Sequence, residues 1–282
     1  MGEQHARDLT DHAVAYLNVD SSASGPDFKA TAVPALNRVV AQAARDVLGL
    51  KDADIVSNRL GSGSDYTVFL NFLGVPIADT TFTGPNGVYH SVYDNHLWMQ
   101  KFGDPGFLRH VAMTRVWGVM AMRLANADVV PLDYRATADR VQEFVRETME
   151  AGGAARRPAL QPLTGAADRF AAAAAAAGTR FDALLATDAP DRRAAALLDE
   201  ALMKTERAFL DAAGLPGRPW YRHLLFAPRP TYAPEVLPGV TESLEAGDAT
   251  QLATQVTRLV AALGRAAAIL DPAEGSSRAR LR

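Results

Sequence analysis

The sequence predicts an α/β fold in its first half and an all-α fold in its second half. Residues 1–131 alternate short apolar runs with segments of helical periodicity, a pattern typical of a mostly parallel sheet covered by helices. From about Pro131 onward one helical segment follows another, and alanine becomes frequent. We therefore expect two portions, 1–132 and 133–282, the first with a parallel or mixed sheet and the second a helical bundle.

Composition narrows the class of protein. The chain has 282 residues, of which 48% are hydrophobic and 22% charged, as in ordinary folded domains. A net charge of -3 gives no general attraction to nucleic acid, and no apolar run approaches the roughly 20 residues that span a bilayer. The sequence contains no cysteine, which excludes disulfides, thiolate zinc sites and cysteine nucleophiles.

The first portion is predicted to hold two short strands and several helices. The strands are apolar runs between turn residues, at 14–19 and 77–82. The helices are expected where apolar residues recur at helical spacing or run together before a glycine, at 30–50, 66–73, 92–101 and 106–126. Gly49 is expected to end the first of these helices, and the glycine- and serine-rich segment 61–65 is expected to be a loop.

The second portion is predicted to consist of four helices. They are expected at 137–151, 162–186, 192–213 and 249–270. A break is expected around Gly152 and Gly153, and a loop rich in proline and aromatic residues is expected at 218–239. The tail 274–282 is expected to be frayed. These alanine-rich helices can pack on the α/β portion of the same chain or against a second copy.

Two residues are candidates for metal binding. Asp20 follows a predicted strand, and open α/β sheets place their sites at the carboxyl ends of strands. His90 follows a turn, and a carboxylate and an imidazole on loops are both suitable metal ligands. The alternative is that Asp20 caps a turn and His90 is a surface residue. The six histidines form no helical zinc pair, and the sequence has neither a nucleophile elbow nor a phosphate-binding loop.

Six segments, in order along the chain, resemble the glutamate carboxypeptidase and transferrin-receptor family of di-zinc metallopeptidases. They are the strand and aspartate at 14–22, the Gly-Ser-Gly-Ser-Asp loop at 61–65, the Tyr-His-Ser motif at 89–94, and the segments at 125–133, 214–223 and 232–239. The resemblance implies the end of a zinc-peptidase domain at 1–132 and a transferrin-receptor-like dimerisation domain at 133–282.

The resemblance also implies a site. In this family two zinc ions hold a hydroxide that attacks a peptide carbonyl. By position, Asp20 is expected to bind one zinc ion and His90 the other. The substrate is expected to contact Tyr89, the loop residues Ser62, Gly63 and Ser64, and Tyr232 from the helical portion. His223 is expected to be a structural residue that supports the Tyr232 loop. The implied partners are a peptide substrate and a second copy of the chain, bound through the helical portion.

The chain departs from the family pattern in its metal site. The family's first histidine ligand, bridging aspartate and catalytic glutamate pair precede the Asp20 strand, and residues 1–19 contain no such motif. We therefore expect no catalytic general base in this chain and no activity from the chain alone. One interpretation is a C-terminal fragment of a secreted, periplasmic or membrane-anchored exopeptidase, which would expose a strand edge and an apolar face. The alternative is a non-catalytic dimerisation or binding module.

A second departure concerns specificity. Where glutamate-preferring members carry an arginine pair, this chain has Asp79 and no arginine, and Thr231 takes the place of a lysine. Ser64 replaces an asparagine of the substrate loop. Basic groups hold acidic side chains, so their loss predicts a broader or neutral peptide specificity.

Overall fold

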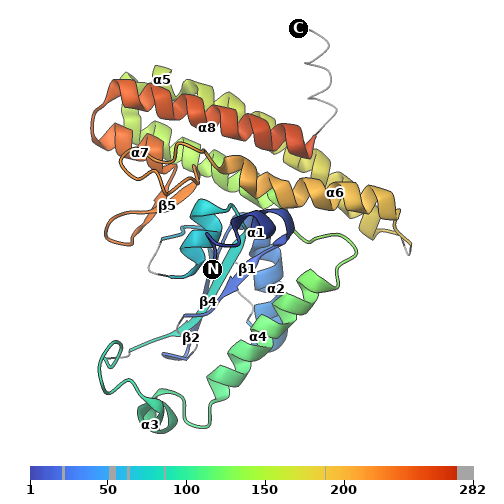
Figure 1. The fold of residues 1–282 in the computed structure, drawn as a ribbon, viewed down its shortest axis with the longest axis vertical. Helices are drawn as coiled ribbons and strands as arrows, with labels where there is room; N and C mark the ends of the chain where they lie inside the picture. The colour runs from blue at the N-terminus through green and yellow to red at the C-terminus, as the bar shows by residue number, and fades with distance from the viewer. Residues whose placement is uncertain (21–22, 51–54, 62–63, 86, 188, 272–282) are drawn as a thin grey trace.

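The four strands of the α/β portion form a mixed sheet. The computed structural model describes residues 1–20, 23–50, 55–61, 64–85, 87–187 and 189–271. The strands follow the order β1-β4-β2-β3, where β1 is Tyr16–Asn18, β2 Asp27–Ala32, β3 Val56–Ser57 and β4 Ile77–Thr83 (Figure 1). The pairs β1/β4 and β2/β3 are parallel, whereas β2/β4 is antiparallel. The prediction of an α/β portion with a parallel or mixed sheet is confirmed.

The α/β portion also contains several helices. They are α1 (Ala6–His12), a 3-10 turn (Pro34–Leu36), α2 (Asn37–Leu48), a π-helix (Val68–Phe72), α3 (His96–Trp98), a second π-helix (Met99–Gly103) and α4 (Leu108–Ala125). Gly49 ends α2 in the left-handed conformation, φ 68°, as predicted. The predicted start of that helix at residue 30 is wrong. Residues 30–32 belong to β2, because pairing with β3 and β4 outweighs their local helical pattern.

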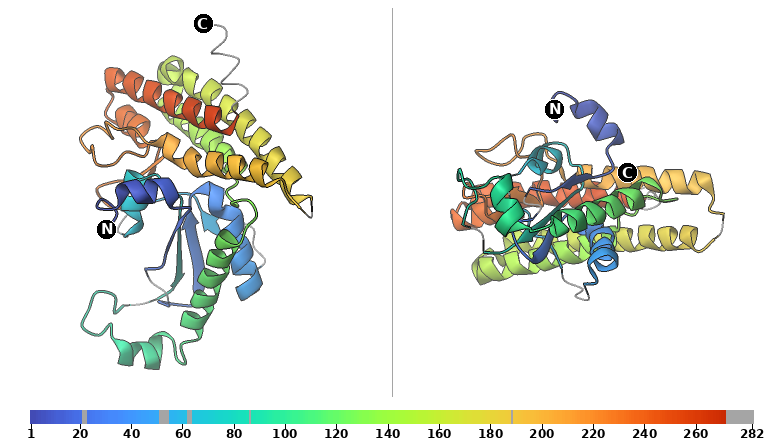
Figure 2. Two further views of the ribbon diagram at one scale, coloured as in Figure 1. Left: turned by 45° about the vertical axis from the view of Figure 1, so that its right-hand side comes forward. Right: turned by 90° about the horizontal axis from the view of Figure 1, so that it is seen from below.

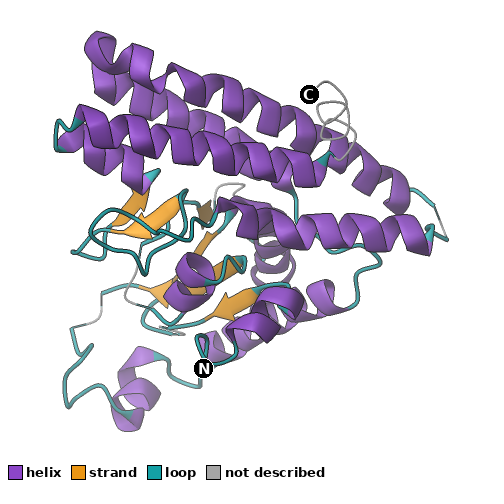
Figure 3. Cartoon of the chain, turned by 45° about the horizontal axis from the view of Figure 1, so that its top comes forward, coloured by secondary structure: helices purple, strands orange, loops and turns teal. Residues whose placement is uncertain are grey.

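The helical portion contains three long helices. They are α5 (Tyr134–Leu185), α6 (Arg192–Thr205) and α8 (Ala249–Leu270), which run side by side in Figure 3. The predicted break is a kink within α5, where Gly153 has the non-helical angles φ 59° and ψ -169°. The predicted helix at 192–213 ends earlier, at Thr205, and a 3-10 turn (Glu206–Phe209) follows. The predicted loop 218–239 holds a small hairpin of β5 (Phe226–Pro228) and β6 (Pro234–Val236), and α7 (Pro238–Glu245) begins at its end. The tail expected to fray lies outside the described residues.

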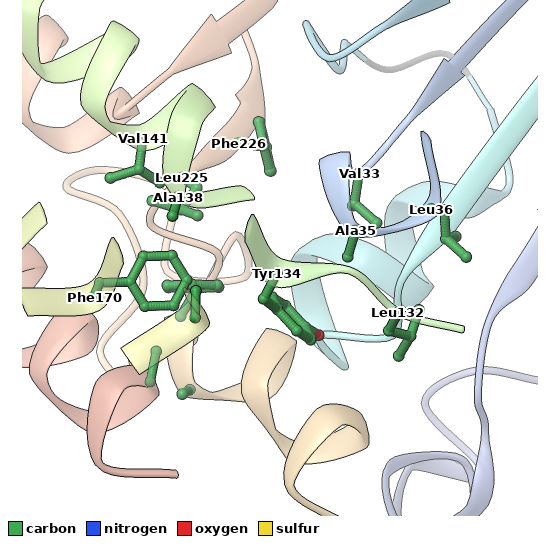
Figure 4. Packing of buried hydrophobic residues seen from close by; sticks show 14 of the residues in the cluster. Val33, Ala35, Leu36, Leu132, Tyr134, Ala138, Val141, Phe170, Leu225 and Phe226 are labelled. Atoms are coloured by element: carbon green, nitrogen blue, oxygen red, sulfur yellow. The ribbon is translucent and has the colours of Figure 1, made fainter. Parts of the chain in front are cut away.

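One continuous apolar core joins the two portions. Tyr134 lies between Val33, Ala35, Leu36 and Leu132 on one side and Phe170, Leu225 and Phe226 of the helical portion on the other (Figure 4). The helical portion therefore packs on the α/β portion of its own chain. None of the helices within the described ranges is long and apolar enough to cross a membrane.

Exposed apolar side chains gather on one segment of the α/β portion. Most large apolar side chains that the described structure leaves in solvent lie between residues 89 and 122: Tyr89, Val92, Tyr93, Leu97, Phe102, Leu108, Val111, Trp117 and Met122. Among the described strands, β1 pairs with β4 alone and occupies an edge of the sheet. Exposed strand edges and exposed apolar side chains are both features that protein interfaces use.

Candidate functional site

A polar cluster lies where β1 and β4 run side by side. Asn18 and Asp79 occupy paired positions on these parallel strands. The Asn18 side-chain amide donates one hydrogen bond to Asp79 Oδ1 at 2.9 Å and another to Ser64 Oγ at 2.8 Å. Two residues beyond Asn18, Asp20 is exposed just past the end of β1. Asn18 therefore links the predicted substrate loop to the strand that carries the predicted metal ligand.

The cluster is electrostatically negative. Burial raises the pKa of the Asp79 carboxyl, the hydrogen bond from Asn18 opposes that rise, and the charge of Asp20 adds to it. Burial also raises the pKa of the Tyr66 hydroxyl, and the charges of Asp79 and Asp20 raise it further. Buried Asp79 and nearby Asp20 give this part of the chain an acidic character, and the broader or neutral peptide specificity expected from the sequence stays a prediction.

Replacement of Asp79 by asparagine is expected to stabilise the protein at neutral pH. The carboxyl has a higher pKa folded than its ordinary value of 3.8, so between these two values the folded chain holds the extra proton. Wild-type stability therefore falls as the pH rises through that window. Urea unfolding should show an advantage for Asp79→Asn at about pH 7 that disappears at about pH 3. The exposed Asp27→Asn on β2 is the control, and an equal pH response in both variants would contradict this account.

The helical portion reaches this site through the loop between β5 and β6. A Cβ atom at residue 61 would overlap the Tyr232 carbonyl oxygen, so only glycine allows this approach. The Tyr66 hydroxyl donates to the backbone carbonyl of Gly61 at 2.8 Å and so holds the glycine backbone in place. Tyr232 has φ 66°, and its side chain is 67% exposed. The tyrosine predicted to contact substrate is therefore held beside the predicted substrate loop and remains accessible.

Ion pairs and backbone hydrogen bonds hold the Tyr232 loop. The loop closes with Tyr232 N–H donating to Arg229 O at 2.9 Å and Arg229 N–H donating to Ala233 O at 2.8 Å. Arg229 pairs with Glu235 and, through two nitrogens, with Glu245. The guanidinium thus ties the loop to β6 and α7. A bidentate contact of this kind restricts the loop more than a single ion pair does.

Asn71 fastens the hairpin to the α/β portion. Its buried side-chain amide donates to the backbone carbonyl of Phe226 at 2.7 Å. The backbone carbonyl of Asn71 accepts from Arg222 N–H at 2.8 Å. Asn71 lies in the π-helix Val68–Phe72, which follows the substrate loop. One residue therefore couples the segment after the loop to the hairpin that carries Tyr232.

His223 is buried in a polar pair, as the prediction of a structural role requires. His223 and Glu206 both have fully buried side chains, and His223 Nε2 lies 3.2 Å from Glu206 Oε1. Leu225 N–H donates to His223 Nδ1 at 3.2 Å. Because Nδ1 accepts this bond, the ring proton sits on Nε2 and is donated to the carboxylate. The histidine is thus fixed in one tautomer directly before the hairpin.

The other predicted site residues are either exposed to solvent or outside the described residues. His90 and Tyr89 are exposed and stack on each other with ring centroids 3.9 Å apart, and His90 has φ 59°. Ser62 and Gly63 lie outside the described residues.

Within the described ranges, no group of three or more histidine, aspartate or glutamate side chains could hold a metal ion. Asp20 and His90 have the chemistry of zinc ligands, but one donor for each zinc ion falls short of the three protein ligands that a catalytic zinc site uses.

Sequence reasoning did not identify Asn18, Asn71 or Glu206 as parts of this arrangement. Each acts through a partner distant in sequence: Asp79, Phe226 and His223, respectively. The presence of Asn18 within the resembling strand 14–22 was the only available signal. The side-chain partners follow from strand register and from the docking of the two portions.

Comparisons with known proteins agree with this architecture. Residues 159–271 match the family model described as the transferrin receptor-like dimerisation domain. The chain is 34% identical to the probable glutamate carboxypeptidase LAMP1 of Arabidopsis thaliana over 86% of its length and 37% of that protein. It is 30% identical to the mouse aminopeptidase NAALADL1, over 96% of its length and 42% of that protein. It is also 30% identical to the inactive zinc metalloprotease C354.09c of Schizosaccharomyces pombe, over 90% of its length and 34% of that protein.

The chain belongs to the transferrin-receptor-like zinc peptidase family. It spans between 34% and 42% of the length of these three relatives. Their names cover a carboxypeptidase, an aminopeptidase and an inactive protein, so membership of the zinc peptidase family does not itself fix one activity. Any finer statement about the activity of this chain must rest on the contacts of its own residues.

Proposed function

We propose that this chain supplies the peptide-binding side of a carboxypeptidase-like peptide hydrolase. The observation that carries the proposal is the approach of Tyr232 to Gly61, which joins the two portions at one accessible place. Ser64, held by Asn18, lies on the same loop as Gly61, and Asp20 follows the same strand as Asn18. In this proposal Tyr232 and Ser64 bind and orient a peptide. The negative cluster around Asp79 favours neutral peptides over acidic ones.

Peptide titration followed by NMR tests this proposal. The dipeptide Ala-Leu is expected to shift the signals of Ser64 and Tyr232 and to bind more tightly than Ala-Glu. Gly61→Ala pushes the Tyr232 backbone away, so we expect affinity for Ala-Leu to fall by about tenfold or more, as for loss of a central contact. Gly118→Ala on α4 is the matched control, because a Cβ there meets no atom within 4 Å. Absence of any Ala-Leu binding to the wild type would overturn the proposal.

We propose that Asp20 binds one zinc ion and His90 binds the other. Each ion requires further donors before the site can be catalytic. When bound, zinc ions supply Lewis-acid activation of water and carbonyl groups. Since the described residues do not make a complete zinc site, elemental analysis of the purified chain should find much less than one zinc per chain. Near-stoichiometric zinc that His90→Ala removes would contradict this expectation, and His12→Ala is the control because that histidine lies outside the site.

We also propose that the chain forms a homodimer through its helical portion. Support comes from the match of residues 159–271 to a dimerisation domain. A non-catalytic dimerisation or binding module is the second candidate function, supported by the relative named inactive. Peptide binding without hydrolysis, in a preparation saturated with zinc, is the result expected from that candidate.

A further inference from the structure

A pocket of about 390 Å³ lies next to the hairpin that carries Tyr232, where the kink of α5 meets α7 and strand β6. Figure 2 shows the yellow-green kink of α5 and the orange helix α7 at the same end of the helical portion. On a straight helix, residues 147 and 156 would point in opposite directions. The kink at Gly153 instead brings both Glu147 and Arg156 to this pocket, whose volume is in the range of small-molecule sites.

Five charged residues line the pocket, and most of them already have a partner. They are Arg59, Glu147, Arg156, Glu235 and Glu245. Arg59 donates to both carboxylate oxygens of Glu147, at 2.6 and 2.7 Å. Glu245 accepts two hydrogen bonds from Arg229, at 2.7 and 3.0 Å. The charges of Glu235 and Arg156 are less completely balanced, and they have opposite signs.

Glu235 carries a negative charge that its surroundings balance only in part. Its side chain is 6% exposed and lines the pocket. Arg229 pairs with it but also holds Glu245, so one guanidinium serves two carboxylates. Burial and the charges of Glu245 and Glu242 raise the pKa of the Glu235 carboxyl in spite of Arg229. A positively charged group that enters the pocket is therefore stabilised by this carboxylate.

Arg156 provides the complementary charge. Its Nη2 donates to the backbone carbonyl of Gly247 at 3.2 Å, and no carboxylate among the described residues pairs with its guanidinium. A guanidinium has five N–H donors, so Arg156 keeps donors for an anionic ligand group. Ala151, Val236 and Leu244 add apolar surface to the same pocket. The pocket thus combines a free cation, an incompletely balanced anion and an apolar wall.

We propose that this pocket binds a free amino acid with an aliphatic side chain, such as leucine. The ammonium group of the ligand pairs with Glu235, its carboxylate pairs with Arg156, and its side chain lies against Val236 and Leu244. The pocket is separate from the proposed peptide site, because none of the residues predicted to bind metal or peptide is among those that line it.

Calorimetric and NMR titrations of the full chain with L-leucine test this site. Leucine is expected to bind with a dissociation constant of about 1 mM or lower and to shift the methyl signals of Val236 and Leu244. Isoamylamine is leucine without the carboxylate, and 4-methylpentanoate is leucine without the ammonium group. Each is expected to bind at least about tenfold more weakly, because each loses one charge-assisted contact.

Two substitutions remove the charged partners of the ligand one at a time. Arg156→Gln and Glu235→Gln are each expected to weaken leucine binding by at least about tenfold. Arg157→Gln and Glu150→Gln are the matched controls, because both residues are exposed on α5 and neither lines the pocket. Since Glu235 is buried, its replacement can also affect folding, and Arg156→Gln then decides the test.

Three results would overturn the leucine site. They are a wild type that does not bind leucine, leucine binding that shifts only Ser64 and Tyr232, and an Arg156→Gln variant that binds leucine as tightly as Arg157→Gln does. Isoamylamine that binds as tightly as leucine would overturn the zwitterionic ligand. Failure of Ala-Leu to bind, with leucine still shifting Val236 and Leu244, would overturn the proposed peptide site and leave this pocket supported.

Discussion

Replacement of His223 by leucine is expected to lower the free energy of unfolding by about 3–5 kcal/mol. The substitution leaves the fully buried Glu206 carboxylate without its imidazole partner and removes the acceptor of the Leu225 N–H bond. A buried polar group that loses a hydrogen-bond partner costs far more stability than a lost surface contact does. Urea unfolding followed by circular dichroism measures the loss.

An exposed pair in the same chain provides the control for His223→Leu. His12 and Asp8 lie 3.0 Å apart, and both side chains are 76% exposed, so His12→Leu should change the free energy of unfolding by about 0.5 kcal/mol or less. The double variant His223→Leu, Glu206→Met is expected to recover part of the loss, because apolar residues then replace both partners. A His223→Leu effect no larger than that of His12→Leu would show that the buried pair contributes no net stability.

Replacement of Phe226 by alanine is expected to cost about 3–5 kcal/mol of stability. Phe226 is fully buried, lies edge-on to Phe144 with centroids 6.2 Å apart, and stacks against His223 at 5.5 Å. Truncation leaves a cavity where the two portions meet. Guanidinium or thermal unfolding measures the loss directly.

Phe102→Ala is the matched control for Phe226→Ala, because the Phe102 side chain is 70% exposed and its removal opens no cavity. We expect its effect on stability to be within about 0.5 kcal/mol. Equal effects of the two truncations would mean that the hairpin is not packed into the core as described.

The long elements were predictable from sequence because their signals are local. Helix α8 has the predicted bounds 249–270, and the Asp248 side chain caps it by accepting from Gln251 N–H. Strand β2 was not predicted, because Ala30 and Ala32 suit a helix and become extended only through pairing with other strands. The β5/β6 hairpin has three-residue strands with a proline at the end of one and the start of the other, which is too short a pattern to recognise.

The site was predictable only in part. Resemblance indicated Asp20, His90 and Tyr232, and these assignments remain predictions. The position of Tyr232 beside Gly61 depends on how the two portions dock, and the contact between Asn18 and Asp79 depends on the register of β1 and β4. Neither the docking nor the register is encoded in a short stretch of sequence, so neither could be inferred before the fold was known.

The close approach of Gly61 and Tyr232 has a consequence for recombining this protein with its relatives. A chimera that exchanges only the helical portion places a foreign hairpin on a glycine loop shaped for a different backbone path. Residue 61, Asn71 and the segment 222–233 must therefore be exchanged together as one inherited unit. Over evolutionary time, substitutions on either side of this contact are expected to be constrained by the other, although about 170 residues of chain separate them.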